Sequence, residues 1–90
     1  MLSRLFSSRT RVKLLELFLL HPEREVHVRE ICRITNLNIN AVRRELANLE
    51  EMGLLTSRRV GNGLFYTANI AFPVYQELVS IFVKLGTGPE

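Results

Sequence analysis

The most regular pattern of the chain lies between residues 39 and 52, where apolar side chains recur every three or four positions. At about 100° per residue, four of them share an arc of roughly 80°: Ile39, Val42, Leu46 and Leu49. Asn38 precedes this segment as a favourable N-cap, and Gly53 follows it as a residue suited to end a helix. We therefore predict an amphipathic helix over residues 39–52 whose outer face is polar.

Two short β-prone segments follow this helix, at residues 54–60 and 64–68. The Gly61-Asn62-Gly63 triplet between them supplies the positive-φ residues that a tight hairpin requires. We predict a β-hairpin whose first strand carries two adjacent arginines, Arg58 and Arg59.

An earlier helix is predicted by apolar residues that fall on one helical face: Val12, Leu15, Phe18 and Leu19. It starts after Ser7 or Ser8, behind a short lead-in of residues 1–7, and runs to Leu20 because Pro22 stops it. Residues 25–27 favour a short strand.

A second helix is predicted over residues 29–35, with Ile31 and Ile34 facing inward. Val28 occupies its N-cap position, although valine caps poorly. The Asn36–Asn38 turn then leads into the helix of residues 39–52, so the two helices form a helix-turn-helix.

The last helix is predicted over residues 73–85, because Pro73 is acceptable in a first turn, and residues 86–90 form a tail. Its apolar side chains cover roughly 200° of arc, more than one packing face needs. An apolar stripe left exposed on a monomer usually marks an interface. We predict that this stripe joins two copies of the chain through five residues: Val74, Leu78, Ile81, Phe82 and Leu85.

Length and composition indicate one domain, residues 1–90, with no room for a second core. The formal net charge is +3, and arginine supplies ten of the twelve positive charges, which suits bidentate contact with phosphate or guanine. Cys32 is the only cysteine, so no internal disulfide forms, as expected in a reducing cytoplasm. No apolar run approaches the length of a membrane span.

Arginine and asparagine gather on the outer face of helix 39–52 and on the hairpin, as a winged helix-turn-helix presents them to DNA. Asn40 is suited to pair with adenine and Arg44 with guanine in the major groove. The hairpin, as the wing, is suited to grip the backbone. The predicted DNA-binding set is Asn38, Asn40, Ala41, Arg43, Arg44, Asn48, Arg58, Arg59 and Asn62. Further phosphate candidates are Arg9, Arg11, Arg29 and Arg33.

Two other functions use the same surface. A winged helix can serve as a protein-interaction module in a larger assembly, but that use favours apolar residues on the outer face of helix 39–52. RNA binding is not separated from DNA binding by the sequence. Catalysis is not expected, because the chain has no aspartate, no Ser-His-carboxylate spacing and no phosphate-binding glycine loop. No cofactor or metal is expected, because Cys32, His21 and His27 lack zinc-ligand spacing.

Five segments carry a family resemblance: residues 5–15, 28–31, 44–49, 53–55 and 66–69. They resemble the ArsR-like winged-helix transcriptional regulators of prokaryotes. The resemblance implies a mainly α fold with a small β-hairpin, in the order α-β-α-α-β-β-α. It also implies a homodimer that binds a palindromic operator. We expect repression by blocking polymerase access as the default mechanism, with activation as the alternative. Metal-sensing members carry a Cys-x-Cys pair where this chain has Cys32-Arg33-Ile34, so metal sensing is not expected.

Overall fold

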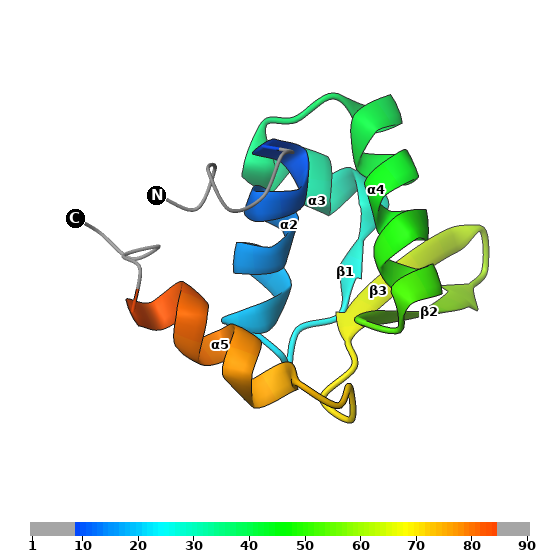
Figure 1. The fold of residues 1–90 in the computed structure, drawn as a ribbon. Coiled ribbons are helices and arrows are strands. Elements are labelled where there is room, and N and C mark those ends of the chain that lie inside the picture. Colours follow the sequence, from blue (N-terminus) through cyan, green and yellow to red (C-terminus); the bar gives the residue numbers. More distant parts are fainter. Residues whose placement is uncertain (1–8, 85–90) are drawn as a thin grey trace.

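The computed structural model describes residues 9–84, and the predicted lead-in, the tail and Leu85 lie outside this range. The elements follow the predicted order, so the predicted fold class is confirmed (Figure 1). They are α2 (Arg9–Leu19), β1 (Val26–His27), α3 (Val28–Thr35), α4 (Ile39–Met52), β2 (Leu55–Val60), β3 (Gly63–Ala68) and α5 (Tyr75–Lys84).

The ends of α3 and α4 are fixed by local hydrogen bonds. Asn38 caps α4 as predicted, since its Oδ1 accepts from the backbone N–H groups of Asn40 and Ala41 at 2.8 and 3.2 Å. Gly53 ends α4 with a φ of 95°. The cap of α3 is His27, not Val28, because the His27 Nδ1 accepts from the Arg29 N–H at 3.0 Å. Imidazole thus supplies the acceptor that a valine lacks.

The three strands form an antiparallel sheet in the order β1-β3-β2. Val60 pairs with Gly63, which leaves a two-residue turn in which only Gly61 has a positive φ, of 59°. Gly63 is constrained by space instead, because a Cβ there would lie 2.9 Å from the Cδ2 of His27. The prediction of a tight hairpin is confirmed, but only one of the three turn residues needs the left-handed conformation.

The core lies between the helices and the inner face of the sheet, and its largest fully buried side chains are Phe18, Phe82, Leu14, Ile31, Leu46, Leu49 and Val42. Two predicted core residues are wrong: Ile34 is 42% exposed and Ile39 is 36% exposed. The core face of α3 is set by positions 28, 31 and 35, which turns Ile34 aside. Ile39 begins α4 at the end farther from the sheet (Figure 1).

The prediction that Phe82 belongs to a surface stripe is also wrong. Its side chain is fully buried and belongs to the core cluster, so it has no surface to offer to a second copy. Tyr75, about two helical turns earlier on the same side of α5, is also buried. Its hydroxyl donates to the Leu19 carbonyl at 3.3 Å. These contacts hold α5 against α2.

Candidate nucleic-acid interface

The outer face of α4 is open and polar. Its buried side carries Val42, Leu46 and Leu49, so the helical period turns the residues between them away from the core. Five outward residues are exposed: Asn40, Arg43, Arg44, Ala47 and Asn48. Ala41 is half-buried at the shoulder of this face. An α-helix with such a face, standing beside a hairpin, has the shape that enters a major groove (Figure 1).

Glu45 is the one charged residue of α4 that turns inward, with 7% of its surface exposed. Arg11 of α2 binds its carboxylate in an ion pair. The Asn48 Nδ2 donates to the same carboxylate at 3.4 Å, so part of the Asn48 amide is occupied within α4. No local pattern indicates this ion pair, because its partners lie 34 positions apart. It fixes α4 against α2 and keeps a negative charge off the outer face.

A hollow of about 460 Å³ lies between the start of α3, α4 and the wing. Its lining brings three arginines from three elements together, namely Arg29, Arg43 and Arg59. Within residues 9–84 none of the three forms an ion pair, and no carboxylate lines the hollow. Asn62 of the turn and Gly63 of β3 complete the side formed by the wing. The arrangement concentrates positive charge where a phosphate can approach.

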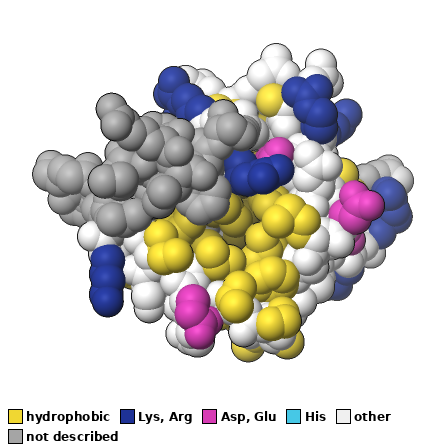
Figure 2. All heavy atoms as spheres, viewed as in Figure 1, with side chains coloured by type: hydrophobic (Ala, Val, Ile, Leu, Met, Phe, Trp, Pro, Cys, Tyr) yellow, Lys and Arg dark blue, Asp and Glu magenta, His cyan; other side chains and the backbone are white. Residues whose placement is uncertain are grey.

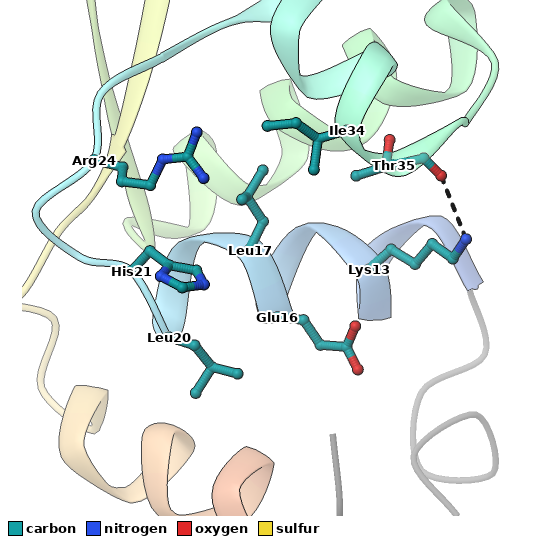
Figure 3. Close-up of a pocket in the computed structure, with 8 residues that line it drawn as sticks. All are labelled: Lys13, Glu16, Leu17, Leu20, His21, Arg24, Ile34 and Thr35. Carbon is teal, nitrogen blue, oxygen red and sulfur yellow. Dashed lines mark hydrogen bonds between the residues drawn. The ribbon is translucent and has the colours of Figure 1, made fainter. Parts of the chain in front are cut away.

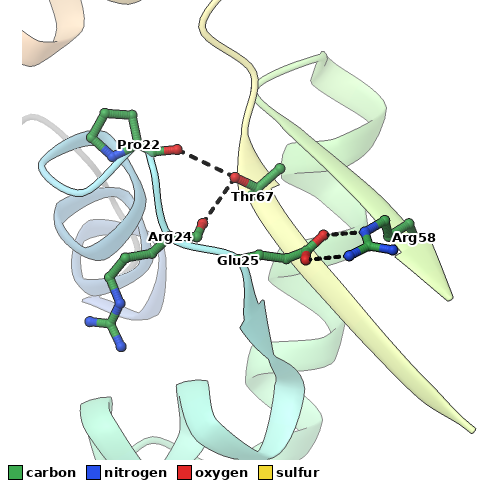
Figure 4. A network of polar contacts seen from close by, with 5 residues as sticks. All are labelled: Pro22, Arg24, Glu25, Arg58 and Thr67. Atoms are coloured by element: carbon green, nitrogen blue, oxygen red, sulfur yellow. Dashed lines mark hydrogen bonds and ion pairs between the residues drawn. The ribbon is translucent and has the colours of Figure 1, made fainter. Parts of the chain in front are cut away.

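The two wing arginines have different environments. Arg58 points to the other face of the hairpin, where Glu25 accepts from its Nε and Nη2 at 2.6 and 2.8 Å (Figure 4). The hydrogen bonds from Arg58 and its positive charge hold the pKa of Glu25 below its ordinary value. Arg59 lies on the face that looks toward α4 and lines the basic hollow. Adjacent positions in a strand point to opposite faces, which explains the difference.

The other predicted residues also divide into those whose side chains remain available to DNA and those already engaged within the protein. The side-chain oxygen of Asn38 is used in capping α4, so Asn38 positions the helix. Among the further phosphate candidates, Arg29 joins the basic hollow, whereas Arg11 is bound by Glu45 and Arg33 by Glu30. Arg29 could be predicted only as one of several phosphate candidates, because no local sequence pattern indicates that α3 begins beside the wing.

The described part of the chain was also considered for a metal site, a reactive cysteine and a membrane-spanning helix. Between residues 9 and 84, no three His, Cys, Asp or Glu side chains are grouped closely enough to hold a metal ion. Cys32 is a half-buried free thiol on α3. None of the helices in this range is long and apolar enough to cross a membrane.

The helix-turn-helix, the hairpin wing and the exposed basic face define a winged-helix protein. The model of the family described as "bacterial regulatory protein, arsR family" matches residues 8–57, more than half of the chain. The chain therefore belongs to the ArsR family: it is a DNA-binding transcriptional regulator and not an enzyme.

Solved structures show the same fold. Reduced HlyU from Vibrio cholerae is 21% identical, with a TM-score of 0.71 over 97% of this chain and 86% of that chain. NolR from Sinorhizobium fredii is 15% identical, with a TM-score of 0.70 over 92% and 78%. The transcriptional regulator HlyU from Vibrio vulnificus is 22% identical, with a TM-score of 0.70 over 94% and 83%. No match was found among curated proteins.

Proposed function

We propose that this regulator reads base edges in the major groove with the outer face of α4. The observation that carries the proposal is the exposed polar face of that helix, where Asn40 and Arg44 lie in the N-terminal half and form no ion pair within residues 9–84. An asparagine amide matches the hydrogen-bonding edge of adenine, and a guanidinium matches that of guanine. Asn38 sets the start of the helix, Ala41 allows close approach, and Arg43 and Asn48 flank the reading residues.

The basic hollow then holds backbone phosphates beside the bases that α4 reads. Arg29, Arg43 and Arg59 come from three elements and converge there without a carboxylate in the lining. Asn62 at the turn adds an uncharged donor. Arg58 makes the weaker wing contact, because Glu25 competes with phosphate for its guanidinium. Phosphate contacts set the position of the protein, and α4 supplies the base preference.

The regulator acts as a homodimer on a palindromic site, and it represses by occupying DNA that the polymerase needs. Support for the dimer comes from the apolar side chains left exposed at α5, where Val74 is 47% and Ile81 is 37% exposed. Leu78 is half-buried beside them, and Phe82 is withdrawn from the interface because it is buried.

An apolar hollow of about 220 Å³ adjoins this surface, where α2, the end of α4 and the segment before α5 meet. Figure 2 shows apolar side chains gathered on this side of the molecule. A contiguous apolar surface of this kind is usually covered by a partner. The twofold symmetry of such a dimer would match that of a palindrome.

Selection of bound duplexes from a random pool tests the base-reading proposal. The expected result is enrichment of a palindromic motif with guanine or adenine at fixed positions in each half-site. If no duplex is enriched and the protein shifts no duplex DNA in a gel, the base-reading proposal is contradicted.

Sedimentation tests the dimer separately. Ile81→Glu is expected to give monomers at micromolar concentration, whereas Ser80→Glu, a change at the neighbouring exposed polar position, is expected to leave dimers. A wild-type chain that is already monomeric contradicts the proposed interface.

A further inference from the structure

A second hollow, of about 380 Å³, lies between α2 and α3 (Figure 3). It shares no lining residue with the basic hollow. Its lining combines the apolar side chains of Leu17, Leu20 and Ile34 with the cationic side chains of Lys13 and Arg24. His21 also lines it. Glu16 and Thr35 complete it. Small-molecule sites typically join an apolar lining to a few polar groups that fix orientation.

The exposure of Ile34 is the first observation that favours a ligand in this cleft. It stands in the first helix of the helix-turn-helix, yet it is 42% exposed and lies over the cleft near Leu17 (Figure 3). An apolar side chain held open to water gains free energy when a ligand covers it. An apolar ligand group seated on α2 and α3 would cover this exposed side chain.

Arg24 is the second sign. Its guanidinium lies at one end of the cleft, and within residues 9–84 it forms no ion pair or side-chain hydrogen bond (Figure 3). The Arg33 hydrogen bond is the main cause that lowers the pKa of Glu30, and the positive charge of Arg24 adds to it. The Glu30 carboxylate is bound by Arg33 and not by Arg24. Lys13 lies at the other end and donates to the Thr35 carbonyl at 3.3 Å. Figure 3 shows Glu16 on the side of α2 away from Thr35.

We propose that this cleft binds a small organic monocarboxylate with an apolar body. The carboxylate receives the planar, two-pronged donor of Arg24, which suits carboxylates better than a single ammonium does. The apolar body covers Leu17 and Ile34.

The cleft is also connected to the wing. The carbonyl of Arg24 lies 2.9 Å from the hydroxyl of Thr67 on β3, and the next residue, Glu25, holds Arg58 of β2 (Figure 4). A ligand that draws Arg24 toward the cleft pulls on the segment that anchors the hairpin. The bound carboxylate is thus an effector that changes the affinity for DNA; this part rests on the proposed function, whereas carboxylate binding does not.

Binding is tested on the whole chain by amide chemical shifts, with benzoate and hexanoate as probes and benzamide and hexanamide as neutral controls. Shifts are expected to centre on residues 17, 24 and 34. Each acid should bind about tenfold more tightly than its amide, the change expected for a charge-assisted hydrogen bond. Arg24→Gln should abolish this preference, because it removes the charge but keeps the backbone contact with Thr67.

Arg33→Gln is the matched control, since Arg33 is an exposed arginine of α3, next to Ile34 in the chain, that does not line the cleft. It should keep the preference for the acids, and Ile34→Ser should weaken acid and amide alike. Equal binding of acid and amide by the wild type, or shifts centred on the apolar hollow beside α5, would overturn the site.

Coupling is tested by the affinity for the selected duplex with and without benzoate. A change of about fivefold or more in the wild type, absent in Arg24→Gln, is expected. An unchanged affinity in the presence of bound benzoate contradicts the coupling. Failure to bind any duplex contradicts the proposed function instead and leaves the carboxylate result standing.

Discussion

The two wing arginines should differ in their effect on the salt dependence of DNA binding. Three arginines that form no ion pair within residues 9–84 line the basic hollow of each chain. The proposed dimer would therefore neutralise about six phosphates, and log K should fall with log[salt] at a slope of about −5. Arg59→Ala removes one contact per chain and should bring the slope to about −3.6. Arg58→Ala should leave it near −5, because Glu25 already neutralises that guanidinium.

Glu25→Gln provides the opposite perturbation. It removes the carboxylate that competes for Arg58, so the slope should steepen to about −7. The assay is fluorescence anisotropy of a labelled duplex between 50 and 300 mM KCl. An equal flattening of the slope by Arg58→Ala and Arg59→Ala would refute the reasoning, since it would mean that Arg58 leaves Glu25 when DNA binds.

Three further predictions concern the fold. Leu46→Ala should lower the free energy of unfolding by about 2–5 kcal/mol in urea titrations, because Leu46 is fully buried; a loss under about 1 kcal/mol contradicts this packing. Gly63→Ala should cost about 1–3 kcal/mol, since its Cβ meets the His27 ring; an unchanged midpoint contradicts it. The lowered pKa of Glu25 means that the Arg58 pair stabilises the fold above the ordinary glutamate pKa, and that this contribution is lost as the pH falls through the lowered value. The acid-side decline in stability should therefore be smaller in Glu25→Gln, and an identical pH profile would contradict the pair.

Helix periods and caps made most of the fold predictable. Asn38 and Gly53 marked both ends of α4, and the glycine-rich triplet located the hairpin, because these signals are local in sequence. The errors arose at positions where tertiary packing determines whether a side chain is buried. Ile34 has the right spacing for the core, but the short α3 presents positions 28, 31 and 35 instead. Phe82 belongs to a helix that is apolar on most sides, so the pattern did not tell its inward side from its outward side.

The types of residue at the candidate site could be predicted from the sequence, but the way these residues meet in space could not. The outward direction of Arg44 follows from the period of α4. The pairing of Arg58 with Glu25 and of Arg11 with Glu45 joins positions more than thirty residues apart, and no local signal reports such contacts. The basic hollow depends likewise on three elements meeting in space.

Base preference of the Arg44→Ala variant is the most direct test of base reading by α4. Selection from the random pool should lose preference at one position of each half-site, at a cost of about 1–3 kcal/mol against the preferred base, while other positions keep theirs. Arg33→Ala, which changes an exposed arginine on α3, should select the wild-type motif. Recovery of the same motif by Arg44→Ala, with all sequences weakened equally, would contradict base reading by this residue.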